Sequence, residues 1–320
     1  MTYKFIIYAP SFDENIGGVI ALHRLCHLLN ECGATAYLHP FIPSFELAFH
    51  NIQEIGAYIK SIQYASSLDN FRVHSDFRTP VLKPSDGFVA PDDCIVVYPE
   101  VVFGNPLRAK NVVRWLLHKP GFHTGKIFYG QDEIFYRYAD FGDDSYSLHG
   151  SVNSDLILRI QYIPVALYLS AASAPPEERK NVAYCVRKGR GRAAAHDLEN
   201  SILIDGKSHV EIAAILAKTH TFISYDLYTH YSYFAAIAGC NSIVIPETGL
   251  SETEWKPQVE DRFGLAYGYD RIDFARATRD RAIERQVRLD SLSLDNTKAF
   301  LRDVETRLAK RSQQQPTQGL

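Results

Sequence analysis

The chain has 320 residues, of which 46% are hydrophobic and 22% charged, with 34 Lys and Arg against 37 Asp and Glu. This balance is typical of a globular protein, and at about 150 residues per domain the length predicts two domains. A disordered, collagen-like or disulfide-scaffold chain would have too few apolar residues or an excess of glycine or cysteine. The net charge of −3 excludes a generally basic surface for nucleic acid, so any anion-binding site must be local.

The five cysteines are dispersed and form no CxxC pair, which is typical of reduced thiols in a cytoplasmic protein. The first predicted strand begins at Lys4, which leaves no room for a signal peptide. The most apolar window, 156–172, is broken by a proline and by charged and polar residues, and it is too short to span a bilayer. We expect a cytoplasmic protein, with contact to the inner face of a membrane or to a partner enzyme left open.

Strand and helix patterns alternate from the start of the chain. The run 4–9 (KFIIYA) has the pattern of a buried strand, and 18–31 is a predicted helix that stops before Gly33. This alternation predicts parallel βαβ units with helices on both faces of a sheet. Further strands are expected at 34–38, 94–98, 112–117, 126–129 and 156–162.

The segment 170–180 (SAASAPPEERK) contains small residues and prolines and is then charged, which predicts a domain linker. After it the alternation restarts. Ser208 and Glu211 have the spacing of a capping box, and Gly239 is expected to end a later helix. Strands are expected at 181–186, 201–204, 220–224 and 242–245, and helices at 208–218, 229–238 and through most of 270–310.

We therefore predict an α/β protein with two Rossmann-like domains facing a cleft, followed by a C-terminal helical segment. The expected divisions are 1–170, 171–270, C-terminal helices at 271–311 that pack back on the cleft, and a disordered tail at 312–320. In such sheets, ligands bind beyond the carboxyl ends of the strands, where the strand order reverses. This rule selects the loops at 10–18, 39–40, 99–100, 118–121, 130–133, 187–192, 205–207, 225–232 and 246–250.

Gly17 and Gly18 open the first long helix, directly after the first strand and its loop. Glycines let a ligand approach the backbone closely, and a helix N-terminus favours an anion. The spacing is neither GxGxxG nor GxxxxGK[ST], so a dinucleotide site and a P-loop are both weakly indicated. A plain turn at the start of a helix stays open as the alternative.

The loop 187–192 (RKGRGR) is the densest basic cluster of the chain and follows the first strand of the second half. Arg187 and Lys188 are predicted to hold a diphosphate, because arginine forms bidentate hydrogen bonds and lysine supplies a point charge. A solvated loop or an RNA-backbone patch are the alternatives. The net charge and the absence of an RNA-binding motif argue against RNA.

The segment 224–232 (SYDLYTHYS) joins a predicted strand to a predicted helix. Asp226 is expected to accept hydrogen bonds from sugar or ribose hydroxyls. Thr229 or Ser232 is expected to cap the helix, whose free N–H groups would face the diphosphate, although a plain N-cap stays open. Glu247 closes the next strand and is expected to contact the sugar or base.

Four side chains at strand ends of the first half are hypotheses for a general base: Glu100, Asp132, Glu133 and His118. Each is more often a surface residue than a catalyst. His23 and His27 are four residues apart on a helix, but no third metal ligand lies near them in the sequence. There is no DxD motif and no GxSxG elbow, so we predict neither a metal site nor a serine hydrolase.

The second half resembles the donor-binding half of GT-B-fold glycosyltransferases of the bacterial surface-polysaccharide type. The resemblance lies in the basic pair after the first strand and in the stretch 208–247, and 112–121 (VVRWLLHKPG) resembles a strand and loop of those enzymes. Retaining members of the family often carry two glutamates eight positions apart. Asp226 and Phe234 stand at these positions here, so the second carboxylate is lost.

The resemblance implies a metal-independent glycosyltransferase that moves a sugar from a nucleotide-sugar to a saccharide or lipid-linked acceptor in surface-polysaccharide synthesis. The nucleotide-sugar is a substrate, so no cofactor is expected, and nucleic acid is not an expected partner. The acceptor would bind the first domain and the donor the second. The alternatives are a sugar-nucleotide epimerase and a non-catalytic protein that binds a nucleotide or a glycan.

The resemblance also implies roles for individual residues. Glu100 and Asp226 are the expected catalytic residues, with Glu100 as the base if the reaction inverts the anomeric centre. The expected contacts to the donor and its diphosphate are Gly17, Gly18, Arg187, Lys188, Thr229, Ser232 and Glu247.

Overall fold

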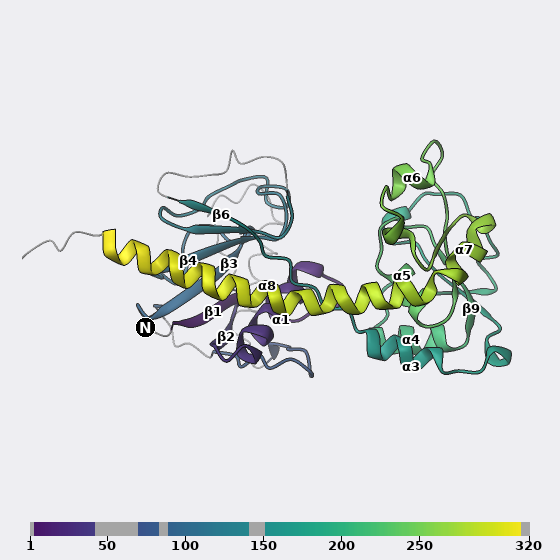
Figure 1. Cartoon of the computed structure of the whole chain (residues 1–320), viewed down its shortest axis with the longest axis horizontal. Helices are drawn as coiled ribbons and strands as arrows, with labels where there is room; N and C mark the ends of the chain where they lie inside the picture. Colours follow the sequence, from purple (N-terminus) through teal and green to yellow (C-terminus); the bar gives the residue numbers. More distant parts are fainter. Residues whose placement is uncertain (1–2, 42–69, 83–88, 141–150, 315–320) are drawn as a thin grey trace, which may run out of the picture. The chain divides into compact units, whose positions relative to one another are not determined.

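The computed structural model describes residues 3–41, 70–82, 89–140 and 151–314. The chain divides into two compact units (Figure 1). Unit 1 consists of Met1–Tyr162 and Ser291–Leu320, and unit 2 of Ile163–Asp290. The elements of unit 1 are β1 Lys4–Ala9, α1 Gly17–Glu31, β2 Thr35–Pro40, β3 Cys94–Pro99, β4 Asn111–Leu116, β5 Ile134–Arg137, β6 Val152–Ile157 and the C-terminal part of α8 Arg279–Gln314.

The six strands of unit 1 form one parallel sheet in the order β2-β1-β3-β4-β5-β6. The strand order reverses at β1, because β2 and β3 lie on opposite sides of it. Alternate residues of β1 are buried on opposite faces, with Phe5 and Ile7 in one cluster and Ile6 and Tyr8 in another. Burial on both faces explains why this strand reads as a continuous apolar run.

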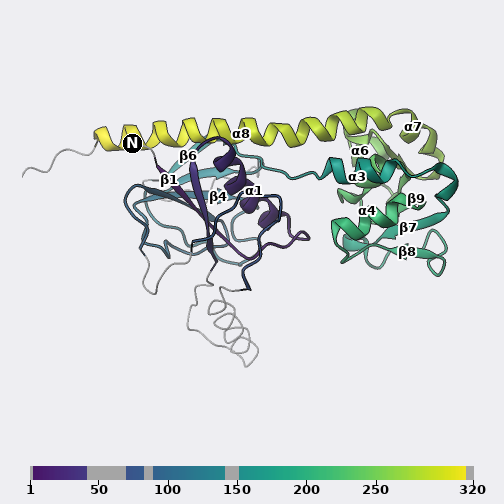
Figure 2. The ribbon, with the colours of Figure 1, turned by 90° about the horizontal axis from the view of Figure 1, so that it is seen from below.

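One face of the unit 1 sheet is covered by α1 and by the C-terminal part of α8 (Figures 1 and 2). Leu25 and Leu29 of α1, together with Phe300 and Val304 of α8, are buried against this face. These positions recur at the helical spacing of three to four residues, so each helix presents an apolar stripe to the sheet. Gly33, with φ of +84°, ends the turn after α1 in the left-handed region that favours glycine.

Unit 2 contains a second parallel sheet, in the order β11-β10-β9-β7-β8. The strand order reverses at β7, which lies between β8 and β9. The elements of unit 2 are α3 Val165–Ala172, β7 Asn181–Cys185, β8 Ser201–Leu203, α4 His209–Ala217, β9 Thr219–Ser224, α5 Tyr231–Ile237, β10 Asn241–Val244, α6 Glu252–Trp255, β11 Leu265–Tyr267, α7 Ile272–Ala277 and the first part of α8.

The helices of unit 2 cover both faces of its sheet. One cluster joins α3, α4 and α5 to β7 and β9, and Figure 2 shows α3 and α4 close together. On the other face, Ala275 of α7 packs against Ile243 and Ala266. The predicted capping box is confirmed, since Ser208 caps α4 and accepts a hydrogen bond from the backbone of Glu211. The predicted α/β class, with two parallel sheets and a C-terminal helix, is therefore confirmed.

The division between the units differs from the predicted one. The chain passes from unit 1 to unit 2 at Tyr162 and Ile163, ahead of the predicted linker at 170–180. The reason is that Tyr168 and Ala171 of α3 are buried in the core of unit 2. The predicted helical region 271–311 is also not a separate part, because α8 contributes to both units and extends to Gln314. The rest of the predicted tail, 315–320, lies outside the described residues.

Several predicted strands are shifted or wrong. No strand forms at 126–129, and the strand that pairs with β4 is β5, a few residues later. The strand expected at 156–162 overlaps only the end of β6. All five cysteines are free, as expected from their spacing. Within the described ranges, no helix combines the length and the apolar character needed to cross a membrane.

Candidate functional site

A cavity of about 720 Å³ lies in unit 2. Its walls are formed by the loops that follow β7, β9 and β10, including Lys188, Arg190, Asp226, Tyr228 and Glu247. These loops meet beside β7, where the strand order reverses, so the cavity lies where a parallel α/β sheet binds ligands. Three of the loops selected from the sequence, 187–192, 225–232 and 246–250, therefore line one cavity, and the binding of a ligand there stays a prediction.

The cavity is lined by side chains of both charges. Lys188 and Arg190 are exposed, and neither forms an ion pair or a side-chain hydrogen bond with any residue that the structure describes. Glu247, on the loop after β10, is also exposed. Asp226 is buried, and its Oδ1 accepts a hydrogen bond from the backbone of Tyr228 at 3.0 Å. A ligand with both an anionic group and hydroxyl groups would find partners for both in this cavity.

Arg187 does not line this cavity. The carboxylate of Asp205 accepts hydrogen bonds from the backbone N–H groups of Val186 and Arg187, the latter at 2.8 Å. Arg187 itself has a φ of +42°, in the left-handed region. Its guanidinium lies over the ring of Tyr231, 5.0 Å from the ring centroid. Of the predicted Arg187–Lys188 pair, only Lys188 lines the cavity, and Arg190 and Arg192 line it beside Lys188.

Arg192, the last cation of the basic loop, is used by the protein itself. Its guanidinium donates to the carbonyl oxygens of Tyr225, at 2.7 Å, and of Ile245, at 2.9 Å, and also to that of Pro246. These carbonyl groups lie on the loops after β9 and β10. Arg192 therefore joins three loops of the cavity wall, and its positive charge stays beside the cavity because carbonyl groups do not neutralise it.

Gly189 allows the basic loop to approach the loop after β9. A Cβ atom at this position would lie 2.2 Å from the carbonyl oxygen of Tyr225, which is backbone and has little room to move. The sequence shows two glycines in this loop, but only the structure shows which of them is required by close packing. At Gly191, by contrast, the space for a Cβ atom is open and φ is +85°.

We expect Gly189→Ala to weaken ligand binding in the unit 2 cavity at least tenfold, because the loop that carries Lys188 and Arg190 must move away from Tyr225. Gly191→Ala is the matched control, with only the cost of a left-handed alanine, about 1 kcal/mol. Titration of each variant with a nucleotide-sugar, the ligand expected from the sequence, measures the effect. Equal affinities for the two variants would contradict the packing argument.

The predicted helix cap does not reach the cavity. Helix α5 begins at Tyr231, and Thr229 accepts a hydrogen bond from the backbone of Tyr231 at 3.3 Å. Ser232 is buried, and its carbonyl oxygen accepts a hydrogen bond from Ser242. Neither Thr229 nor Ser232 lines the cavity. The seven-residue length of α5 also gives it little dipole to offer an anion.

Phe234, at the position of the lost carboxylate, is a core residue. Its ring stacks on that of Tyr168 of α3, with centroids 4.5 Å apart and an interplanar angle of 7°. The side chain therefore belongs to the packing between α5 and α3. The rings of His209 and His230 also lie against it, with centroids 5.3 and 6.0 Å from its own, so the phenylalanine is explained by the core of unit 2.

A second cavity, of about 350 Å³, lies in unit 1 at the carboxyl ends of β1, β3 and β4. Gly18 lines this cavity at the start of α1, whereas Gly17 does not. Since both glycines belong to unit 1, their predicted contact with donor phosphates stays a prediction. Neither glycine has a left-handed φ, and neither would bring a Cβ atom closer than 3.5 Å to a neighbour.

Among the described residues that line the unit 1 cavity, Glu100 is the only carboxylate. It follows β3, is 5% exposed, and accepts a hydrogen bond from the backbone N–H of Leu117 at 3.0 Å. Burial raises the pKa of this carboxyl group, against the opposing effect of backbone hydrogen bonds that stabilise the charged form. A buried carboxylate with a raised pKa in a cavity has the properties of a general base. His118 lines the same cavity.

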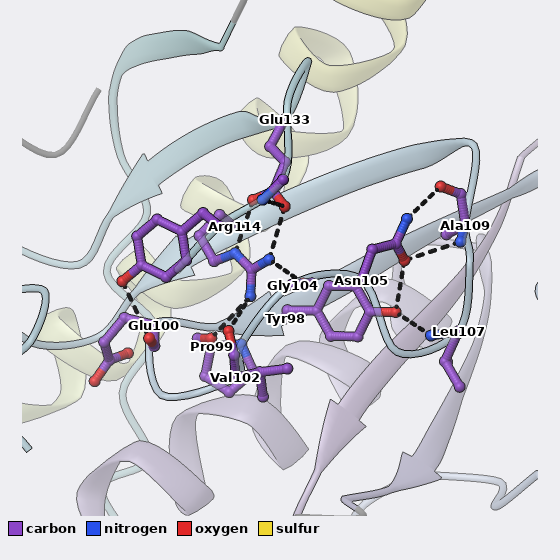
Figure 3. A network of polar contacts seen from close by, with 12 residues as sticks. Tyr98, Pro99, Glu100, Val102, Gly104, Asn105, Leu107, Ala109, Arg114 and Glu133 are labelled. Carbon is purple, nitrogen blue, oxygen red and sulfur yellow. Dashed lines mark hydrogen bonds and ion pairs between the residues drawn. The ribbon is translucent and has the colours of Figure 1, made fainter. Parts of the chain in front are cut away.

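Glu133, another predicted base, is held in a structural ion pair (Figure 3). Arg114 donates to both of its carboxylate oxygens, at 2.7 and 2.8 Å, and both side chains are almost fully buried. The remaining guanidinium N–H groups donate to backbone carbonyl oxygens, including those of Val102 and Gly104 at 2.7 Å. Glu133 also accepts from the backbone of Gly130. The hypothesis that Glu133 is a base is therefore wrong.

We expect Glu133→Gln to lower the free energy of unfolding by about 3–5 kcal/mol, because it leaves the buried Arg114 without its counter-charge. Urea unfolding followed by circular dichroism measures this loss. Asp92→Asn is the control, since it breaks an ion pair with Lys110 in which both side chains are exposed, and we expect little change there. A Glu133→Gln protein as stable as the control would refute the structural role.

The two histidines four residues apart on α1 have other partners. His23 is buried, and its Nε2 lies 2.9 Å from the carbonyl oxygen of Pro10, on the loop after β1. Burial lowers its pKa to about 4, so it is neutral near pH 7. His27 accepts a hydrogen bond from the backbone N–H of Arg78 at 2.9 Å. In the described part of the chain, no three His, Cys, Asp or Glu side chains are grouped as a metal ion would need.

The chain has a likeness to known proteins in structure alone. No family model matches the chain, and no curated protein matches it. Among solved structures, spinosyn forosaminyltransferase SpnP aligns with 96% of this chain and 95% of its own, at 12% identity and a TM-score of 0.33. A similarity at this identity and TM-score does not indicate a shared activity.

Proposed function

We propose that the protein is a glycosyltransferase that moves a sugar from a nucleotide-sugar to an acceptor hydroxyl. The observation that supports this most directly is the unit 2 cavity, with two exposed cations and two carboxylates at the point where the strand order reverses. A nucleotide-sugar combines an anionic diphosphate with a sugar rich in hydroxyl groups. One nucleotide-sugar therefore has a partner for the cations of the cavity and a partner for its carboxylates.

In this proposal Lys188 and Arg190 bind the diphosphate and stabilise the charge that develops on it as the bond to the sugar breaks. The Oδ2 atom of Asp226 and the carboxylate of Glu247 accept hydrogen bonds from sugar hydroxyls. This assignment keeps Lys188, Asp226 and Glu247 from the sequence prediction and replaces Arg187 with Arg190.

The acceptor is proposed to bind unit 1, with Glu100 as the base. The carboxylate takes the proton of the acceptor hydroxyl as the oxygen attacks the anomeric carbon. The bond between that carbon and the diphosphate oxygen breaks, and its electron pair leaves with the nucleotide diphosphate. Direct attack of this kind inverts the anomeric centre. The resemblance of the sequence supports surface-polysaccharide synthesis as the process that the enzyme serves.

The first experiment is a thermal-shift panel of UDP-, GDP-, CMP- and dTDP-sugars, with and without magnesium. A ligand at a hundred times its Kd adds about 2.7 kcal/mol of stability. We expect one nucleotide class to raise the melting temperature selectively. Binding followed by transfer to an acceptor supports the proposal, whereas binding without turnover indicates a non-catalytic protein. Conversion of the donor sugar without an acceptor indicates an epimerase, and no binding at all contradicts the proposal.

A further inference from the structure

The unit 1 cavity is apolar over most of its wall. Apolar side chains line it from α1 and from the residue before this helix: Ile16, Val19 and Leu22. Phe41 lines it directly after β2. Leu117, after β4, closes another side. A saccharide would bury several hydroxyl groups against these side chains, and each hydroxyl without a hydrogen-bond partner carries a cost. The walls therefore favour an apolar ligand over a sugar.

In the described part of the cavity wall, polar side chains come from three residues. Glu100 and His118 follow β3 and β4, and His123 lies on the turn after β4. Glu100 is the one buried acid among them. A ligand that fills this cavity therefore needs an apolar body and few polar atoms, with a hydrogen-bond donor directed at Glu100. An alcohol meets both conditions.

The approach to the cavity is also apolar. Ile16, which lines the cavity, is 51% exposed, and Phe122, which packs against the ring of His118 with centroids 4.2 Å apart, is 66% exposed. Large apolar side chains exposed beside an apolar cavity extend the surface on which such a ligand can bind. Ile127, another exposed apolar side chain, lies beside Gly121, 3.3 Å from where a Cβ atom of Gly121 would lie.

We propose that the unit 1 cavity binds the apolar body of an amphiphilic alcohol, whose hydroxyl group is directed at Glu100. The role of this alcohol as an acceptor rests on the proposed glycosyltransferase activity. With that activity, the acceptor is an apolar alcohol rather than a free saccharide. The apolar body can come from a linear lipid chain or from a compact ring system. Both share the same chemistry in the cavity: an apolar surface with one hydroxyl donor.

The test is calorimetric titration of the full chain with two alcohols, in the absence of any nucleotide-sugar. n-Decanol represents a linear chain and 2-naphthalenemethanol a compact ring system, with methyl β-glucoside as the polar comparison. We expect at least one alcohol to bind at least tenfold more tightly than the glucoside. Tighter binding of n-decanol assigns a chain, and tighter binding of 2-naphthalenemethanol assigns a ring system. Binding of neither alcohol, or equal binding of the glucoside, overturns the inference.

Two glycine variants locate the binding. Gly18→Leu places a side chain in the cavity, and Gly17→Leu places the same side chain one residue earlier, outside the cavity walls. We expect Gly18→Leu to weaken alcohol binding at least tenfold and Gly17→Leu to leave it unchanged, with circular dichroism verifying that both variants fold. Equal effects of the two variants overturn the placement. Because this titration concerns unit 1 alone and the nucleotide-sugar panel concerns unit 2, failure of one is distinguishable from failure of the other.

Discussion

Replacing both Lys188 and Arg190 with alanine is expected to weaken nucleotide-sugar binding about a hundredfold or more, without unfolding the protein. Hydrogen bonds to charged groups contribute about 1.5–3 kcal/mol each, and every 1.4 kcal/mol is a factor of ten in affinity. Both side chains are exposed and neither pairs with another described residue, so their removal leaves no buried group without a partner. The loss therefore falls on the ligand rather than on the fold.

The same measurement distinguishes the roles of Arg187 and Arg190 in the basic loop. Arg187→Ala is expected to change affinity far less than Arg190→Ala, because the guanidinium of Arg187 lies over Tyr231 and does not line the cavity. Lys218→Ala is the control for charge, since this exposed lysine follows α4 away from the cavity. A double variant that binds as tightly as the unchanged protein would remove Lys188 and Arg190 from the site. A larger loss with Arg187→Ala than with Arg190→Ala would restore the original prediction.

The example of Arg187 shows what the sequence could not predict. The pattern placed a basic loop beyond a strand and so located the cavity, because the topology of parallel sheets decides where ligands bind. Which cation lines that cavity depends on the left-handed φ of Arg187 and on the hydrogen bond from its backbone N–H to Asp205, eighteen positions later in the chain. Contacts of this kind have no local signature.

The acids of unit 1 illustrate the same limit. Glu100 and Glu133 both follow predicted strands, at 94–98 and 126–129, and the sequence makes each of them a hypothesis for the base. The structure separates them because Arg114, on β4, pairs with Glu133 and leaves Glu100 in the cavity. The sequence carries one signal of this pair, the arginine within the apolar strand pattern VVRWLL. An arginine that is buried in a strand needs an acidic partner nearby. The strand predicted at 126–129 is wrong for a different reason. Its apolar side chains Ile127 and Phe128 are exposed and are not buried in the sheet.

Glu100→Gln is expected to lower kcat about 10²- to 10⁴-fold while leaving the Kd of the nucleotide-sugar unchanged, because it removes the proposed base and leaves unit 2 intact. The substitution keeps the size of the side chain and one oxygen to accept from Leu117, so the fold should persist. Asp132→Asn is the matched control, because Asp132, another base hypothesis from the sequence, does not line the unit 1 cavity. This exposed residue has a φ of +58°, which asparagine adopts readily, and we expect kcat to stay unchanged.

The pH dependence of kcat/KM tests the same residue independently. Burial raises the pKa of Glu100 above its usual value of 4.5, and the base acts only when it has lost its proton. The rate of the unchanged enzyme should therefore fall as the pH decreases through a pKa above 4.5, and Glu100→Gln should lose this limb. The linked effect on stability has the opposite direction: this carboxyl group contributes stability below pH 4.5, and the contribution is lost as the pH rises through the raised pKa. An acidic limb that persists in Glu100→Gln would assign the titration to another group and contradict the role of Glu100 as the base.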